Sequence, residues 1–242
     1  MASIALICEG VSEIKMLSYI INRYLGDDIV VNAIQPSLKL SHRQEKQDAG
    51  GGWAQVLSHC SDDVINNIMT ANDYLVVQID TDACTQPNYD VDIYDENHQK
   101  VIDAVLYDRV CVRLKRNISE DVWKKHSDKI LFAICFDETE CWLLPVYYED
   151  DAKKRCATTN CIYILNQKLQ KDGIGIPKDK KNSPEAIRVY QKILKKIKRK
   201  DIPRISQYNW GFKKFVEQMD AIKEEIANVT QLRPQCGRNN VF

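Results

Sequence analysis

Four short runs rich in apolar residues, separated by longer amphipathic segments, constrain this chain most. The runs span residues 3–8, 28–35, 73–80 and 129–135, and all are far shorter than the ~20 apolar residues that a membrane-spanning helix needs. The segments between them carry apolar side chains at helical spacing, as in residues 11–25. Strands that alternate with helices predict an α/β fold, with a mainly parallel, Rossmann-like sheet flanked by helices.

The same patterns predict the remaining elements. Helices are expected over residues 53–69, over 101–114 and over 120–125, and a further helix is expected to open at Asp137. The polar stretch 36–52, which ends in three glycines, predicts a loop. Trp53 follows those glycines, and we expect it to begin a helix and pack in the core. In a second interpretation, residues 50–56 close over a site as a mobile loop.

The formal net charge of zero hides a strong asymmetry along the chain. Residues 1–152 contain thirteen Lys and Arg against twenty-six Asp and Glu, whereas residues 153–200 contain fifteen against three. This split predicts an acidic domain over residues 1–150 and a basic, mainly helical extension over 151–242 that packs on it. An acidic centre beside a basic surface is typical of proteins that bind metal ions and phosphate.

Nine cysteines are scattered along the chain, and no two of them form a CxxC pair. The four histidines do not supply a companion motif, so the spacing disfavours a structural zinc site. The first apolar run, residues 3–8, is too short for a signal peptide and is followed at once by Glu9, so export is not expected. We therefore expect reduced thiols in a cytoplasmic protein, with no membrane partner.

Carboxylates follow three of the four expected strands. Glu9 and Glu13 come after the first, and Asp80 and Asp82 end the third. Glu138 and Glu140 follow the fourth. Ligands of open parallel sheets bind at the carboxyl ends of the strands, and clustered carboxylates require a counter-charge such as Mg²⁺ or Mn²⁺. Taken singly, each of these residues could instead serve a turn or a helix N-terminus.

The motifs in this order resemble a known family. The segment Cys8-Glu9-Gly10-Val11-Ser12-Glu13 resembles the EGxxE opening of Toprim domains, and Asp80-Thr81-Asp82 resembles their DxD motif. The run from Glu138 to Leu144 is similar to the ETExW segment of compact Toprim proteins related to OLD (overcoming lysogenization defect) nucleases. A weaker similarity covers Gly211 to Val216.

The resemblance implies a Mg²⁺- or Mn²⁺-dependent nuclease with one or two ions. Glu9 and Glu13 would bind metal or act as general acid and base, and Asp80 and Asp82 would be metal ligands. Glu138 and Glu140 would complete a second metal site or orient the substrate. Relatives use a lysine late in the domain, for which the candidates are Lys178, Lys180 and Lys181. The resemblance also implies prokaryotic antiviral defence with a partner ATPase of the ABC or OLD type.

A helix is expected to begin at Ser183 and Pro184, which are favoured at the N-cap and the first helical position. One face carries an apolar stripe, and the others carry the basic residues Lys192, Lys195, Lys196, Lys198 and Arg199. We expect these, with the three lysines of the preceding loop, to contact the phosphates of DNA or RNA. The alternative is a solvated surface helix.

The leading hypothesis is thus a phosphodiester hydrolase acting on DNA or RNA. Two alternatives stay open: a non-catalytic Toprim-like subunit that binds metal or nucleic acid, and a metal-nucleotide-dependent transferase that uses Asp80 and Asp82. The choices between DNA and RNA, between endo- and exonuclease, and between monomer and homo-oligomer also stay open.

Overall fold

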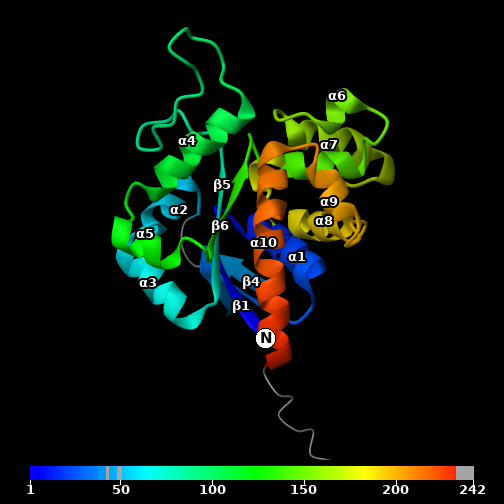
Figure 1. The fold of residues 1–242 in the computed structure, drawn as a ribbon. Helices are drawn as coiled ribbons and strands as arrows, with labels where there is room; N and C mark the ends of the chain where they lie inside the picture. Colours follow the sequence, from blue (N-terminus) through cyan, green and yellow to red (C-terminus); the bar gives the residue numbers. More distant parts are fainter. Residues whose placement is uncertain (42–43, 48–50, 233–242) are drawn as a thin grey trace, which may run out of the picture.

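A sheet of four parallel strands lies between two layers of helices in the computed structural model, which describes residues 1–41, 44–47 and 51–232 (Figure 1). The strands are β1 (Ala2–Ile7), β2 (Ile29–Gln35), β5 (Tyr74–Asp80) and β6 (Ile130–Cys135), in the order β2-β1-β5-β6. The predicted α/β fold with a parallel sheet is therefore confirmed. No helix in the described part of the chain is long and apolar enough to cross a membrane.

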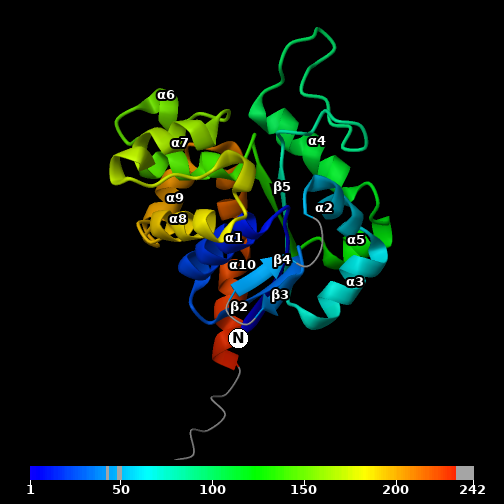
Figure 2. The ribbon, with the colours of Figure 1, turned by 180° about the vertical axis from the view of Figure 1, so that it is seen from behind.

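The helices divide between the two faces of the sheet, as Figures 1 and 2 show from opposite sides. One face carries α1 (Val11–Leu25), α6 (Ala152–Arg155), α7 (Cys161–Leu169), α8 (Pro184–Leu194), α9 (Asp201–Ser206) and α10 (Trp210–Leu232). The other carries α2 (Trp53–His59), α3 (Asp62–Ala71), α4 (Asp103–Lys115) and α5 (Glu120–His126). The remaining elements are the 3-10 helices η1 (Thr139–Val146), η2 (Gln170–Asp172) and η3 (Lys178–Lys180), and the antiparallel pair β3 (Leu38–Ser41) and β4 (Gln44–Gln47).

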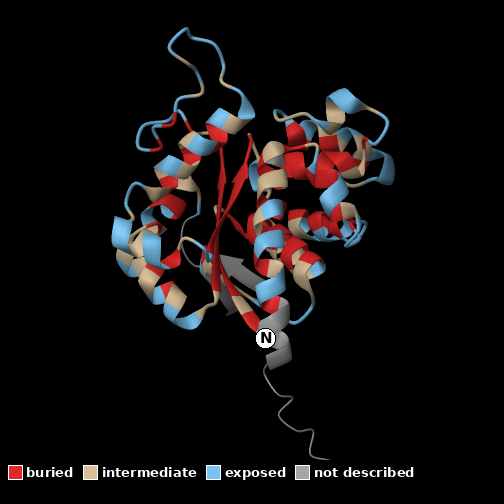
Figure 3. Cartoon of the chain, viewed as in Figure 1, coloured by how far each residue is buried: buried red, intermediate tan, exposed pale blue. Residues whose placement is uncertain are grey.

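Each central strand is buried on both faces, so its side chains alternate between two hydrophobic cores. Leu6 and Val76 belong to the core under α1, α8 and α10, whereas Ile7 and Val77 belong to the core under α2 to α5. Every residue of β5 and β6 is buried, which Figure 3 shows as red strands between half-exposed helices. This double burial explains the continuous apolar runs in the sequence.

Three of the expected elements differ from the structure. The single helix predicted for residues 53–69 is two helices, because Ser61 adopts an extended conformation and starts α3. The predicted loop 36–52 contains the β3–β4 hairpin. Its strands are short, and β4 is wholly polar, although Leu38 and Leu40 alternate in β3. The helix expected after Asp137 is the 3-10 helix η1. Gly50, the start of the suggested lid over residues 50–56, lies outside the described residues.

The expectation that all thiols are reduced is wrong for one pair. Cys141 of η1 and Cys161, the first residue of α7, form a disulfide. Both residues are buried, and twenty positions separate them in the sequence. Their spacing carries no signal, because only the packing of α7 against η1 brings them together.

The C-terminal helix α10 closes the sheet on the side of β6. The Gln218 side chain accepts a hydrogen bond from the Phe132 amide (2.8 Å) and donates one to the Phe132 carbonyl (3.0 Å). These bonds satisfy two backbone groups of the edge strand β6 that no neighbouring strand in the described part of the chain could reach. Trp142 of η1 stacks on Phe212 of α10, with ring centroids 4.5 Å apart. Residues 211–216 and the ETExW segment, both singled out in the sequence, therefore pack against each other.

We expect Gly211→Ala to destabilise the protein. A Cβ atom at Gly211 would lie 1.9 Å from the Ile134 carbonyl oxygen, so α10 would have to move away from β6. A cost of about 3 kcal/mol in the free energy of unfolding is expected, as for an overpacked core. Urea unfolding of the wild type and the variant measures this difference in the free energy of unfolding. Gly175→Ala is the matched control, because its Cβ would have only an ordinary contact, 3.5 Å from the Asn166 Oδ1 atom; equal stability of the two variants would contradict the packing argument.

Candidate metal centre

The site lies where the strand order changes direction. The chain passes from β1 to β2 on one side of the sheet and from β5 to β6 on the other, so β1 and β5 are adjacent at the switch point. Ligands of open α/β sheets bind in the crevice outside the carboxyl ends of such strands. Glu9 follows β1 and Asp80 ends β5, which places both acidic residues at this crevice.

Hydrogen bonds fix Glu9 and Asp80 relative to each other. The Asp80 amide donates to Glu9 Oε1 (2.7 Å), and the Glu9 amide donates to Gln78 Oε1 (3.0 Å). Gln78 Nε2 donates to Asp80 Oδ1 (2.7 Å), and the Thr139 hydroxyl donates to the same oxygen (2.8 Å). Gln78 and Thr139 are not among the candidate residues that the sequence motifs indicate. The signal for Gln78 was its polar side chain inside an apolar strand, where it is fully buried.

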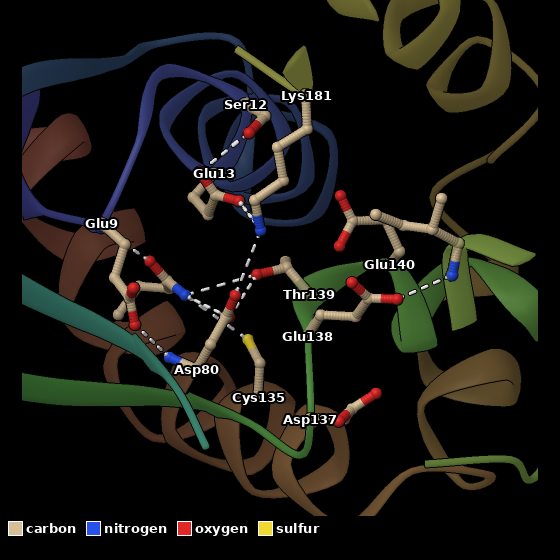
Figure 4. Close-up of polar contacts among 12 residues, drawn as sticks. Glu9, Ser12, Glu13, Asp80, Cys135, Asp137, Glu138, Thr139, Glu140 and Lys181 are labelled. Atoms are coloured by element: carbon tan, nitrogen blue, oxygen red, sulfur yellow. Dashed lines mark hydrogen bonds and ion pairs between the residues drawn. The ribbon is translucent and has the colours of Figure 1, made fainter. Parts of the chain in front are cut away.

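Lys181 brings a positive charge into the cluster. Its Nζ atom lies 3.2 Å from Glu13 Oε1 and 3.4 Å from Asp80 Oδ2 (Figure 4). Glu13 sits in the first turn of α1, and Lys181 directly follows η3. Of the three loop lysines singled out in the sequence, Lys180 is exposed and the side chain of Lys178 lies outside the described part. The structure thus brings Lys181 to the carboxylates.

Gly10 allows the chain to turn tightly from β1 into α1. A Cβ atom there would lie 2.5 Å from Glu13 Oε2 and 2.7 Å from the side-chain nitrogen of Asn182. Ser12 Oγ lies 2.8 Å from the same Glu13 oxygen, and the Ser12 amide donates to Asn182 Oδ1 (2.9 Å). The Glu-Gly pair therefore has a physical basis, because only glycine leaves room for the Glu13 carboxylate.

Glu140 is a fully buried carboxylate on the other side of the cluster. Its Oε1 atom accepts a hydrogen bond from the Tyr190 hydroxyl of α8. Its Oε2 atom is buried and has no hydrogen-bond partner among the described residues. Tyr190 recurs at helical spacing among the apolar residues of α8, and nothing in that pattern distinguishes it from a packing residue. A buried carboxylate oxygen without a partner is the kind of atom that a cation would satisfy.

Asp82 and Glu138 lie at the margin of the cluster. Asp82 is exposed, and its amide donates to the Asp137 carbonyl (3.0 Å). Glu138 Oε1 accepts from the Ile162 amide (2.7 Å), and Asp137 Oδ2 accepts from the Asn160 amide (3.0 Å), so both carboxylates engage the N-terminus of α7. The assignments of Asp82 and Glu138 as metal ligands stay predictions. Asp82 and Asp137 also line a cavity of about 200 Å³.

Several carboxylates share the single positive charge of Lys181. Burial raises the pKa of Asp80 and Glu140, and burial with the nearby charge of Glu13 raises the pKa of Glu9 to about 8. Burial opposes the charge on Lys181, but Glu13, Asp80 and Glu140 outweigh it and raise its pKa above the ordinary value. The site thus carries surplus negative charge, which protons or a further cation would neutralise.

The residues present offer the type of ligand atom that a hard divalent cation prefers. Carboxylate oxygens are the preferred ligands of Mg²⁺ and Mn²⁺, and Glu13, Asp80 and Glu140 are held by the surrounding structure. Among the described residues, the group whose ligand atoms already lie close enough together for a metal ion is Asp137 with the sulfurs of Cys141 and Cys161. Its two sulfurs form the disulfide, so they are not thiolate ligands in this state. The carboxylates of Glu13, Asp80 and Glu140 would have to move closer together around an ion.

The metal-free protein is expected to lose stability as the pH rises from about 5 to 8. The pKa of Glu9 is raised from its ordinary 4.5 to about 8, so the folded state holds a proton that the unfolded chain has released. The stabilising contribution is complete below pH 4.5 and is lost as the pH passes through 8. The Tm of the protein in EDTA, measured at several pH values between about 5 and 8, reports this loss of stability.

Glu9→Gln is the matched variant, because it keeps the Oε1 acceptor for the Asp80 amide and removes the titrating group. Its Tm should fall less than that of the wild type over the same pH range. A wild type whose Tm is flat or rises between pH 5 and 8, or a variant with the same slope, would contradict the assignment.

Comparisons with known proteins identify no relative of this chain. No family model matches it, and no match is found among curated proteins or solved structures.

Proposed function

We propose that this chain is a divalent-metal-dependent nuclease that hydrolyses phosphodiester bonds of DNA or RNA. The observation that supports it most is the buried cluster of Glu13, Asp80 and Glu140 around Lys181, at the carboxyl ends of β1 and β5. A bound Mg²⁺ or Mn²⁺ would polarise the scissile phosphate and lower the pKa of a coordinated water. The oxygen ligands for it would come from Glu13, Asp80 and Glu140.

Glu9 is suited to move a proton in this reaction. It lies at the partly exposed edge of the cluster, and its Oε1 atom is oriented by the Asp80 amide. Burial and the neighbouring carboxylates raise its pKa to about 8 in the metal-free protein, and a cation in the cluster would lower it again. A carboxylate with a pKa near neutrality can accept a proton from an attacking water.

Lys181 is suited to stabilise the charge of the phosphate. Its side chain is oriented by two carboxylates, and about a quarter of it is accessible from outside (27%). A fixed ammonium group beside the reacting phosphorus would favour the negative charge that develops on the phosphoryl oxygens. The resemblance to OLD-type nucleases implies a late lysine with this role, and Lys181 fits it by position.

A basic surface that extends from the site along α8 offers the nucleic acid a place to lie, and its Lys195 lies beside Arg23 and Asp27 at the far end of α1. Lys192, Lys195, Lys196, Lys198 and Arg199 are all exposed. They lie on α8 and in the turns after it, and α8 begins three residues after Lys181. Phosphate contacts of this kind position a strand without reading its sequence. A role in antiviral defence and an ABC- or OLD-type partner ATPase rest on the family resemblance alone.

One observation favours a second candidate function. Lys181 already neutralises part of the cluster, so the carboxylates could form an internal ion-pair network without any metal. The chain would then be a non-catalytic subunit that binds nucleic acid through its basic surface. Metal binding and cleavage distinguish the two proposals.

We expect cleavage of DNA or RNA that requires Mg²⁺ or Mn²⁺ and that EDTA abolishes. Supercoiled DNA, single-stranded DNA and structured RNA should each be tested. Asp80→Ala and Glu9→Ala should lower the rate at least about a hundredfold, and Lys181→Met should do the same by removing the cation beside the phosphate. Glu120→Ala is the control, because Glu120 is an exposed carboxylate on α5.

The thermal shift with Mn²⁺ is measured on the same variants. The wild type should gain stability with Mn²⁺ and Asp80→Ala should not, since a ligand that binds only the folded state raises Tm. Cleavage that survives Asp80→Ala and Glu9→Ala would place the active site elsewhere. Stabilisation by Mn²⁺ without cleavage of any substrate would favour the non-catalytic subunit.

Charge reversal of Lys195, Lys196 and Lys198 together should weaken nucleic-acid binding and flatten its salt dependence. Each phosphate contact that is lost removes about one unit from the slope of log K against log salt concentration. Fluorescence anisotropy at several salt concentrations measures both quantities. Charge reversal of Lys124, Lys125 and Lys129, three exposed lysines on and near α5, is the control; equal effects of the two triple variants would reject the assigned surface.

A further inference from the structure

Two buried cysteines and an aspartate meet where η1 lies against α7. The sulfurs of Cys141 and Cys161 and a carboxylate oxygen of Asp137 all lie within 4.8 Å of one another. The spacing of cysteines in the sequence disfavours a zinc site, but these two are twenty positions apart, and only the fold brings them together. Two sulfurs and a carboxylate at this range are a common set of zinc ligands.

Hydrogen bonds hold the three residues in place independently of the disulfide. Asp137 Oδ2 accepts from the Asn160 amide (3.0 Å), and Glu138 Oε1 accepts from the Ile162 amide (2.7 Å). Cys161 stands between Asn160 and Ile162 in the chain, so both bonds keep it beside Asp137 when the S–S bond is open. A tetrahedral zinc ion with Zn–S bonds of about 2.3 Å needs its sulfurs about 3.8 Å apart, which rotation of the cysteine side chains can reach.

Asp137 is held as ligating carboxylates usually are. Its amide donates to Thr81 Oγ1 (2.8 Å), and its carbonyl accepts from the Asp82 amide (3.0 Å). Together with the bond from Asn160, these contacts fix both the backbone and the carboxylate. A carboxylate has enough lone pairs to accept a hydrogen bond and bind a metal ion at once, and such bonds commonly orient metal ligands.

A cavity of about 200 Å³ borders Asp137. Asp82 and Asp103 also line it, against one lysine among its described lining residues, Lys100. The surplus of acidic groups attracts cations to this cavity. A water molecule in it would supply the fourth ligand of a tetrahedral ion that three side chains hold.

We propose that Asp137, Cys141 and Cys161 form a zinc site when the disulfide is reduced. Thiolates are soft ligands that favour Zn²⁺ over Mg²⁺ and Mn²⁺, which prefer the oxygen ligands of the carboxylate cluster around Lys181. The chain thus carries two metal sites of different chemistry. In the reduced protein, the zinc ion replaces the disulfide as the link between η1 and α7. This site does not depend on the proposed nuclease activity.

The change between the two states requires a reductant, and a dithiol supplies the two electrons. Thiol–disulfide exchange breaks the S–S bond and leaves two cysteine thiols, while the dithiol becomes a disulfide and gives up its two protons. Zn²⁺ then forms two Zn–S bonds and one Zn–O bond, and the two thiol protons pass to the solvent.

Co²⁺ in place of Zn²⁺ tests the site in the full chain. Cobalt bound to thiolate absorbs in the near ultraviolet through sulfur-to-metal charge transfer, whereas cobalt bound only to carboxylates does not. Protein reduced with dithiothreitol, which is then removed under nitrogen, should show this absorption, and the oxidised protein should not. Zn²⁺ should remove the absorption and excess Mg²⁺ should leave it. A thiol assay in urea should find two more free thiols after reduction.

Variants identify the ligands. Cys161→Ser should lose the absorption, and Asp137→Asn should raise the Kd for Co²⁺ at least about tenfold. Cys156→Ser is the matched control, because Cys156 is an exposed free thiol on the chain just before Cys161. Circular dichroism establishes that each variant is folded, and the comparison of reduced with oxidised wild type stands without any variant.

Four results would overturn the proposal. They are a reduced wild type without the absorption, an absorption that the oxidised protein shares, an absorption that survives Cys161→Ser, and an Asp137→Asn variant with the wild-type Kd.

Discussion

The contact of Lys181 with Glu13 and Asp80 is the interaction on which the arrangement of the site depends. It joins three segments that are far apart in the sequence: the first turn of α1, the end of β5 and the loop before α8. Buried carboxylates at such short range would repel one another strongly without a cation among them. One lysine for several carboxylates leaves a surplus of negative charge, and this surplus is the physical reason to infer a metal ion.

The backbone is shaped to bring these charges together. The strand order places β1 beside β5, and hydrogen bonds between Glu9, Gln78 and Asp80 connect the ends of the two strands. Gly10 leaves room for Glu13, and Gly211 lets α10 approach β6. The site is therefore supported by the sheet itself on one side and by helices from the C-terminal half of the chain on the other.

Much of this could be predicted from the sequence. The bounds of α1 and of the four parallel strands follow from apolar periodicity, because that pattern is a local property of strands and helices buried in this way. The positions of Glu9 and Asp80 at the carboxyl edge follow from the strand ends. The hairpin of β3 and β4 was missed, because β4 is wholly polar and β3 contributes only the two alternating leucines Leu38 and Leu40. The break at Ser61 was also missed, because helical spacing continues on both sides of it.

The sequence by itself determined the α/β class, the parallel sheet and the edge at which carboxylates gather, because each depends on neighbouring residues along the chain. Only the tertiary structure selected Lys181, paired Cys141 with Cys161, set Tyr190 against Glu140, and placed Glu138 at the N-terminus of α7. Each of these contacts joins residues 20 to 168 positions apart, and they are decided by how helices pack on the sheet. Burial, which raises the pKa values of the site, likewise exists only once the chain has folded.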